Sequence, residues 1–279
     1  MTPYQKRYGG LVPDSIIQPN KFIDNLLGRY SERRFNGKSL EPGVLELLVA
    51  AAQSAPTSGT LQSWSVIALT TPEEKAKLFG NNKQSDNNLQ IIGGIDSHNV
   101  TAIETSAVVL IWLADLSRIK LVLDSAKVAD DIKEQPEFAE YHLKAIIDAT
   151  IAAQTLYLAA ESMGITGTYC GAIRQLPIKF LEKEFNLPKY TFPIFGTIHG
   201  YNNTKYTRRV KPRLPSELVL HRGTYTKLEN VDDLERHNTT YVTHSANSGY
   251  CARVVERLRP SDTKNETGIA LRHMGFDFK

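Results

Sequence analysis

The strongest constraint on the fold is a continuous apolar run of strand length, SAVVLIWLAD, from Ser106 to Asp115. It lacks the alternation of apolar and polar residues that marks a strand with one solvated face, so it predicts a central strand buried on both faces. A second segment, ATIAAQTLYLAAESMG, is apolar nearly all round and predicts the buried part of a helix over 138–163 that stops at Gly164. Both elements need covering layers, so the chain is expected to form a layered domain.

Other periodic segments predict the strands and helices around this core. A helix is predicted after Pro42 and before Pro56, because apolar residues recur there on one face: Val44, Leu47, Leu48 and Ala51. Apolar, branched residues predict strands over 65–71 and 192–201. The segment 80–99, rich in Asn, Gln and Gly, predicts a long surface loop. A further helix is expected to start near Pro177.

Strands separated by helices indicate an α+β or α/β fold, and the chain divides into three segments. Residues 1–20 carry little periodicity and are interpreted as an N-terminal arm. Residues 21–230 hold the segments that predict the core. Residues 231–279 form a more polar C-terminal excursion. A chain of 279 residues, 41% of them apolar, is long enough to build such a core.

Composition and motifs disfavour several classes of protein. The formal net charge of +3, from 33 basic and 30 acidic residues, is too balanced to indicate nucleic acid as a partner. Cys170 and Cys251 lie far apart, which predicts no metal site and no disulfide. The N-terminus MTPYQKRYGG lacks the apolar core of a signal peptide, and no run reaches about 18 apolar residues, so we expect a cytoplasmic protein that does not bind a membrane.

Known catalytic motifs are also missing. The sequence has no GxxxxGK[ST], no GxGxxG after a strand, no HExxH and no GxSxG, which disfavours a Rossmann dehydrogenase and a catalytic triad. The seven histidines are scattered, and His199, inside a predicted strand, is interpreted as structural.

The segment RYSERRF, residues 29–35, places three arginines in seven residues, which repel one another unless an anion lies among them. A solvated surface loop is the alternative. Three other places offer donors for an anion or a polar ring: the hydroxyl-rich loop 57–62, the small-residue turn 169–172, and Lys211 with Arg213. Together they suit a ligand with a phosphate tail and a flat polar head.

Five motifs follow one another along the chain in an order and spacing typical of a known family: RYSERRF, APTSGTLQSWSVI, SMGITGTYCGAIR, LPKYTFPIFGTIHGY and KPRLPSELVLH. They resemble the FMN-dependent nitroreductase superfamily, in its branch of NADPH-dependent oxygen-insensitive nitroreductases and flavin reductases. The resemblance implies an α+β sandwich, in which helices flank a central, mostly antiparallel sheet. It also implies an intertwined homodimer with one FMN at each of two interface clefts, and a C-terminal excursion that packs on the partner and the cofactor cleft.

The resemblance also implies the cofactor-binding residues by position. Four would line the phosphate, ribityl and pyrimidine side of FMN: Arg29, Tyr30, Ser31 and Arg33. Two would close on the phosphate and pyrimidine from the other end: Lys211 and Arg213. Four would come from the partner subunit: Thr57, Ser58, Gly59 and Gln62. Four would run beside the flavin ring, with a backbone amide near N5: Tyr169, Cys170, Gly171 and Ala172.

Three positions depart from the family pattern. Arg29-Tyr30-Ser31 stands where His-Arg-Ser is usual, and Gly171-Ala172 stands where Gly-Gly is usual. The family's glutamine before the central strand has no counterpart around 97–99.

No catalytic residue beyond FMN is expected, because the flavin itself carries the redox chemistry. NADPH would pass a hydride to N5, and an acceptor would then collect two electrons in the same cleft, a ping-pong scheme. Nitroaromatics, quinones and free flavin are the expected acceptors. Arg33 or Lys211 would stabilise the anionic reduced ring. Two sets of arginines are candidates to bind the 2′-phosphate of NADPH. One set is Arg253, Arg257 and Arg259, and the other is Arg208 and Arg209. The alternative interpretation is that these arginines are solvated helix charges. A flavin-binding sensor or carrier with low turnover remains the second hypothesis for function.

Overall fold

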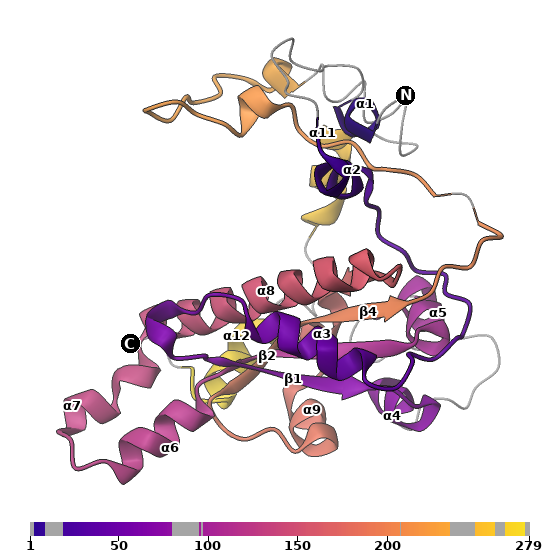
Figure 1. The fold of residues 1–279 in the computed structure, drawn as a ribbon. Coiled ribbons are helices and arrows are strands. Elements are labelled where there is room, and N and C mark those ends of the chain that lie inside the picture. The colour runs from indigo at the N-terminus through magenta and orange to yellow at the C-terminus, as the bar shows by residue number, and fades with distance from the viewer. Residues whose placement is uncertain are drawn as a thin grey trace. The chain divides into compact units, whose positions relative to one another are not determined.

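The computed structural model describes residues 3–8, 19–79, 95, 97–206, 208–234, 249–259 and 266–276 (Figure 1). The chain divides into two compact units. Unit 1 comprises Met1–Tyr30 and Lys205–Pro260, and unit 2 comprises Ser31–Thr204 and Ser261–Lys279. Each unit is therefore built from segments that are far apart in the sequence.

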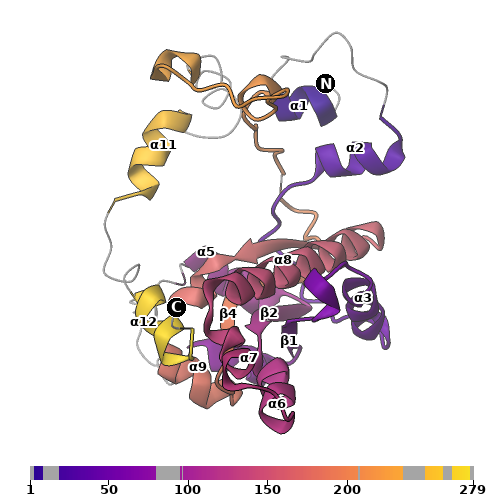
Figure 2. The same ribbon diagram turned by 90° about the vertical axis from the view of Figure 1, so that its left-hand side faces the viewer.

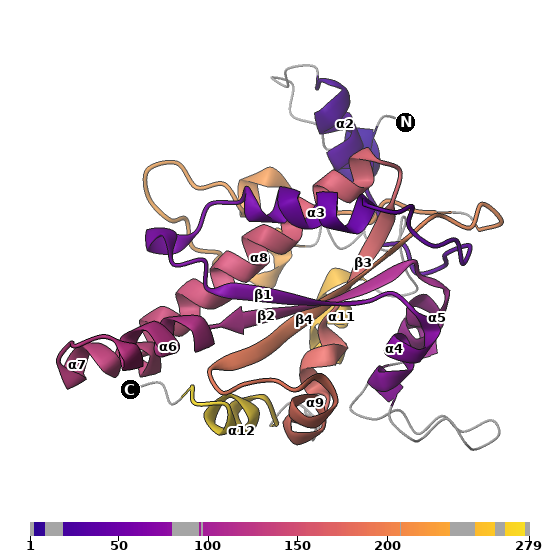
Figure 3. The ribbon, with the colours of Figure 1, turned by 60° about the horizontal axis from the view of Figure 1, so that its bottom comes forward.

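Unit 2 contains a four-stranded sheet in the order β1-β2-β4-β3, with every neighbouring pair antiparallel (Figure 3). The strands are β1 (Trp64–Leu69), β2 (Val108–Asp115), β3 (Thr166–Cys170) and β4 (Thr191–Gly200). In register, Ile67 lies opposite Ile111, and Ile111 lies opposite Gly196. All eight residues of β2 are buried, which confirms the central strand expected from its continuous apolar run.

The long helix α8 (Ala139–Ser162) covers one face of this sheet and contacts all four strands, and α3 (Val44–Gln53) packs against it. Helices α9 (Ile178–Phe185) and α12 (Glu266–His273) lie on the other face (Figures 1 and 2). By length and composition α8 could cross a membrane, but one side of it is buried against the sheet of unit 2. The remaining elements are short: η1 (Ser58–Thr60), α4 (Pro72–Ala76), η2 (Lys77–Phe79), α5 (Ser97–Thr105), α6 (Ser117–Ser125), α7 (Asp130–Lys133), η4 (Gln135–Glu137) and η5 (Gly171–Gln175).

A missing side chain allows η5 to pack closely on β4. A Cβ atom at Gly196 would lie 2.2 Å from Cδ1 of Ile173, well inside van der Waals contact. Glycine at this position therefore lets the turn that follows β3 cross directly over the middle of β4. Nearby, the Trp112 ring nitrogen donates to Oγ1 of Thr197 at 3.0 Å, which satisfies both polar groups inside the core.

Unit 1 contains α1 (Pro3–Tyr8), α2 (Lys21–Gly28), η6 (Ser216–Leu218), η7 (Val231–Leu234) and α11 (Tyr250–Arg257). Helices α1 and α2 contact each other. The side chain of Asn20 accepts a hydrogen bond from the amide of Ile23 at 3.0 Å, an N-cap that starts α2 at Lys21.

The predicted α+β architecture, an antiparallel sheet flanked by helices, is confirmed. The structure differs from the sequence-based prediction in several places. Residues 3–8 form α1 inside the predicted arm, and residues 97–105 form α5 where a loop was expected over 80–99, although 80–94 and 96 lie outside the described residues. Strand β3 was not predicted, because five residues that include Gly167 and two threonines show no periodicity. The domain boundaries at residues 20 and 230, and the homodimer, stay predictions.

Candidate functional site

The arginine-rich segment leaves α2 at Arg29 and passes into unit 2 at Ser31. Its anchor is Glu32, which is buried and donates its amide to the carbonyl of Gly167 on edge strand β3 at 2.8 Å. The Glu32 carboxylate accepts from the amides of Arg33 and Arg34 at 3.0 and 2.9 Å. Ser31 and Arg34 are exposed and Arg33 is half-buried. The structure therefore fixes the main chain from which Ser31 and Arg33 project.

In unit 1 the main chains of three predicted cofactor-binding cations, Arg29, Lys211 and Arg213, meet around a residue that was not predicted from the sequence. Arg7 of α1 is only 6% exposed. Its guanidinium donates to the carbonyls of Arg29 at 2.7 Å and Lys211 at 2.9 Å, and the amide of Arg213 donates to the carbonyl of Arg7 at 3.0 Å. We call Arg7, Arg29, Lys211 and Arg213 the cation cluster. The sequence signal for Arg7 was weak, because a basic pair in a segment without periodicity suggests a solvated arm.

The cation cluster concentrates positive charge in a partly desolvated place. Burial, followed by the nearby charges of Arg213 and Arg29, lowers the pKa of Arg7 to about 10 from its usual 12.5. The carbonyl of Lys211 accepts from two guanidinium groups, those of Arg7 and Arg213, the latter at 3.1 Å. Such an arrangement favours the binding of an anion with several acceptor oxygens.

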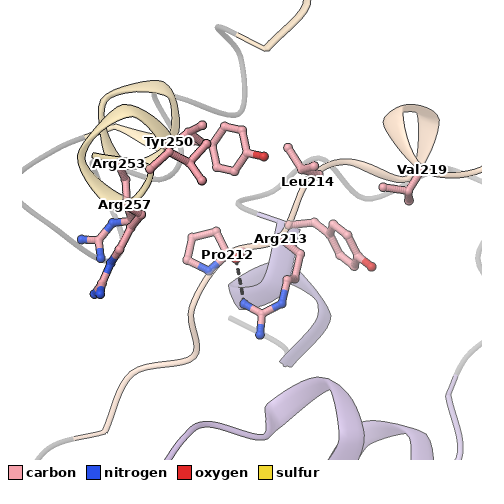
Figure 4. A pocket seen from close by; sticks show the side chains of 10 residues that line it. Pro212, Arg213, Leu214, Val219, Tyr250, Arg253 and Arg257 are labelled. Carbon is pink, nitrogen blue, oxygen red and sulfur yellow. Dashed lines mark hydrogen bonds between the residues drawn. The ribbon is translucent and has the colours of Figure 1, made fainter. Parts of the chain in front are cut away.

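A pocket of about 710 Å³ lies in unit 1 beside Arg213. Figure 4 shows Arg253 and Arg257 on α11 across from Arg213, with Pro212 and Tyr250 between them. Arg253 and Arg257 are four residues apart and share one face of the helix. Arg259, Arg208 and Arg209 do not line this pocket. The remaining lining residues are Tyr8, Leu214, Val219, Val254 and Leu258.

The loop 57–62, which we call the hydroxyl loop, is held in unit 2 by a buried carboxylate of α8. Asp148 is 1% exposed and accepts from the amide of Ser58 and from Oγ of Ser63, both at 2.9 Å. Thr60 and Gln62 have φ values of 58° and 50°, a region that residues with a Cβ rarely adopt. Backbone strain of this kind clusters at functional sites and persists where surrounding contacts impose it.

A second clamp holds the end of the same loop. The guanidinium of Arg118 donates to the carbonyls of Gln62 at 2.9 Å and Trp64 at 2.8 Å, and it pairs with Asp115 at 2.9 Å. A pocket of about 740 Å³ lies here, lined by Thr57, Thr60, Gln62 and Arg118 among others. The two clamps present the side chains of the hydroxyl loop from a fixed main chain.

The turn 169–172 also depends on α8. The hydroxyl of Tyr169 donates to Gln154 at 3.0 Å, and its ring stacks on that of Tyr157 with centroids 5.4 Å apart. Cys170 is buried at the end of β3, and Gly171 is exposed at the start of η5. Among the residues that the structure describes, a Cβ atom at Gly171 would meet only Arg174, at 3.6 Å, and that packing does not require glycine there.

The predicted site residues thus form two sets. Unit 1 holds Arg29, Tyr30, Lys211 and Arg213, of which Arg29, Lys211 and Arg213 join in the cation cluster. Unit 2 holds Ser31, Arg33, the hydroxyl loop and the turn 169–172, and α8 contacts the loop through Asp148 and the turn through Gln154. Ser97 begins α5, and the family's glutamine has no assigned counterpart there. The missed residues, Arg7, Glu32, Arg118 and Asp148, all act on main-chain groups, which no motif reveals.

Comparison with known proteins decides the family. The sequence model of the Nitroreductase family matches residues 26–201. The chain belongs to the nitroreductase family. It is 33% identical over 219 residues to a Cr(VI) reductase of Pseudomonas sp. (strain G-1), a match that covers 78% of this chain and 81% of that protein. It is 31% identical over 222 residues to an FMN reductase (NADPH) of Bacillus subtilis (strain 168), covering 80% of each.

A solved structure shares the fold. Nitroreductase A from Vibrio parahaemolyticus superposes with a TM-score of 0.75 at 27% identity, over 94% of this chain and 100% of that one. The recognition made from the five motifs is therefore confirmed, and with it the nitroreductase-like sandwich.

Proposed function

We propose that this nitroreductase-family protein is an NAD(P)H-dependent FMN oxidoreductase of the nitroreductase and flavin reductase type. The observation that carries the proposal is the cation cluster. Arg29 comes from a segment distant from Lys211 and Arg213, all three were expected to bind FMN on sides that include its phosphate, and their main chains meet at Arg7. Membership of the family and the similarity to an FMN reductase (NADPH) support the same function.

The residues present suit FMN. The cation cluster offers guanidinium and ammonium donors to a phosphate dianion, and each charge-assisted hydrogen bond contributes about 1.5–3 kcal/mol. Ser31 and Arg33 project from a main chain anchored by Glu32, and we assign them to the ribityl and pyrimidine side. Ser58, Gly59 and Gln62 of the hydroxyl loop, and the backbone of 169–172, would contact the ring system. We propose that the hydroxyl loop serves the FMN of the partner subunit.

The protein's own part in the chemistry is electrostatic and positional. When bound, FMN supplies the redox chemistry, accepting a hydride from NADPH at N5 and passing two electrons to an acceptor. Arg33 or Lys211 would place a fixed cation where negative charge develops on the pyrimidine, which needs no reorganisation during the reaction. One cleft that takes the reductant and then the acceptor predicts ping-pong kinetics.

The pocket beside Arg213 is our candidate site for the phosphorylated adenosine of NADPH. Arg253 and Arg257 offer two guanidinium groups on one face of α11, and Tyr250 and Pro212 offer flat apolar surfaces. These residues favour the first of the two candidate sets over Arg208 and Arg209. A lower KM for NADPH than for NADH is the expected result.

A homodimer is part of the proposal. Three apolar side chains of α8 recur every four residues and stay exposed in the single chain, at 55%, 49% and 37%: Leu143, Ile147 and Ile151. We call them the α8 stripe. An exposed apolar row on the core helix indicates a surface that another protein covers, and a second copy of this chain is the partner we propose.

Turnover separates the enzyme from a flavin carrier. The FMN-loaded protein is mixed with NADPH and with menadione or a nitrofuran, and NADPH consumption is followed at several concentrations of each. Parallel double-reciprocal lines are expected for the ping-pong scheme, and intersecting lines would contradict it. A protein that holds FMN but consumes no NADPH with any acceptor would instead be the sensor or carrier.

A further inference from the structure

Arg7 lies in the N-terminal segment that precedes the match to the family model. The family match starts at residue 26, whereas Arg7 belongs to α1, the six-residue helix over residues 3–8. Yet Arg7 is more deeply buried than the cofactor-binding cations Arg29, Lys211 and Arg213, which are half-buried or exposed. A buried arginine in an N-terminal arm needs a reason, because burial of a charge is unfavourable unless its donors are satisfied.

The Arg7 guanidinium satisfies its donors on main-chain carbonyls. Nε and Nη2 donate to the carbonyl of Leu27 at 3.2 and 2.9 Å, and Nη2 also donates to that of Arg29 at 2.7 Å. Nη1 donates to the carbonyl of Lys211 at 2.9 Å. One planar fork therefore fixes the chain at the end of α2 and at the Lys211 segment at the same time, which a lysine could not do with equal geometry.

The Arg7 backbone completes the connection. Its carbonyl accepts the amide of Arg213 at 3.0 Å, so both neighbours of Pro212 are bonded to Arg7. The main chains of three predicted cofactor-binding cations, Arg29, Lys211 and Arg213, thus converge on one residue. Among the described residues, Arg7 forms no ion pair with a carboxylate, and its charge adds to those of the ligands around it.

We propose that Arg7 is a positioning residue for the phosphate of FMN, which sets the spacing of Arg29, Lys211 and Arg213 and adds positive charge behind them. The proposal rests on the proposed function. It makes the N-terminal arm a part of the cofactor-binding apparatus. Because the guanidinium acts through carbonyls, its effect falls on the phosphate end of the ligand, while the isoalloxazine ring is contacted by other residues.

A purely structural role predicts something different. Leu27 and Arg29 lie at the C-terminal end of α2, where a cation also stabilises the helix through its last carbonyls. If Arg7 only stabilised α2, its loss would weaken every flavin ligand alike. FMN and riboflavin separate the two roles, because they share the ring and the ribityl chain and differ only in the phosphate.

The test measures dissociation constants for FMN and riboflavin in the full-length protein stripped of flavin. The variants are Arg7→Met, which removes the fork, and Arg7→Lys, which keeps a charge without it. Lys6→Met is the matched control, because Lys6 is the exposed neighbour on the same helix. Urea unfolding of each variant reports whether it is folded.

We expect Arg7→Met to weaken FMN binding roughly ten- to hundredfold, the factor set by about one charge-assisted hydrogen bond, and to leave riboflavin binding within about twofold. The dissociation constant of Arg7→Lys for FMN should lie between those of wild type and Arg7→Met. If Arg7→Met does not fold, the comparison of Arg7→Lys with wild type decides the test. Lys6→Met should match wild type. Equal losses for FMN and riboflavin, or no loss for either, would overturn the proposal. A wild-type protein that binds neither flavin would instead refute the proposed function itself.

Discussion

Arg33 and Arg34 are neighbours in the sequence, but only one of them is assigned to the cofactor. Arg33 is half-buried beside the anchored Glu32, and Arg34 is exposed. We expect Arg33→Ala and Arg213→Ala to weaken FMN retention about tenfold or more, because each removes a charge-assisted contact. Arg34→Ala should retain FMN like wild type. Fluorescence of flavin released on dilution measures this, and equal retention in all three variants would refute the assignment.

His199 shows how a residue can be buried for packing and still set a pH limit. Its two ring nitrogens are buried without a hydrogen-bond partner among the described residues, and burial lowers its pKa to about 3 from 6.5. As the pH falls, His199 therefore takes up a proton in the unfolded chain before it does so in the folded chain. The contribution of His199 to the free energy of unfolding is complete above pH 6.5. Below that pH it is lost progressively, and at pH 4 the loss is about 3 kcal/mol.

The variant His199→Phe keeps a ring and removes the titration. Burial also lowers the pKa of His142, so wild type and variant should both lose stability in acid, and wild type should lose more. Urea unfolding at several pH values between 4 and 7 measures the difference. Parallel curves for the two proteins would contradict the assignment of this acid sensitivity to His199.

Helices and strands were predicted correctly from the sequence where their hydrophobic pattern is strong. Strand β2 and helix α8 were predictable, because β2 is apolar from Val108 to Ala114 and the later part of α8 is apolar nearly all round. Strand β3 and helix α1 were not, because five- and six-residue segments have too few apolar positions to show a period. The clamps on the hydroxyl loop were equally hidden, since Asp148 looks in the sequence like one polar residue on an apolar helix.

Asp148 gives a prediction for that loop. Asp148→Ala leaves the Ser58 amide and the Ser63 hydroxyl without their acceptor, so we expect a loss of about 3–6 kcal/mol in the free energy of unfolding, from two hydrogen bonds to a carboxylate. Faster proteolysis within 57–62 should accompany it. Thr150→Ala, an exposed site on the same helix, should change stability by less than about 0.5 kcal/mol. A similarly small loss for both variants would show that Asp148 does not hold the loop.

At the scale of the whole molecule, the order of five motifs was enough to recognise the family and the sandwich fold. The motifs could not predict that Arg7 joins Arg29, Lys211 and Arg213 in the cation cluster. That arrangement depends on main-chain contacts between the N-terminal arm and a segment about two hundred residues later. The proposed homodimer also concerns the whole molecule, and the exposed α8 stripe is the observation that supports it.

Ile147 lies at the centre of the α8 stripe, so Ile147→Glu should place a charge in the proposed dimer interface. We expect a shift from dimer to monomer in analytical ultracentrifugation, together with loss of FMN. Leu121→Glu makes the same change at an exposed apolar position on α6 and should stay dimeric. A wild-type protein that sediments as a monomer, or equal behaviour of both variants, would contradict the interface.

The proposed function as an NAD(P)H-dependent FMN oxidoreductase is best tested by an anaerobic titration with NADPH. The purified protein is first incubated with FMN, and the visible absorption of oxidised flavin is followed during the titration. We expect a yellow protein that retains FMN through gel filtration and is bleached completely by one NADPH for each bound flavin. A colourless protein that takes up no FMN, or a bound flavin that NADPH does not bleach, would contradict it.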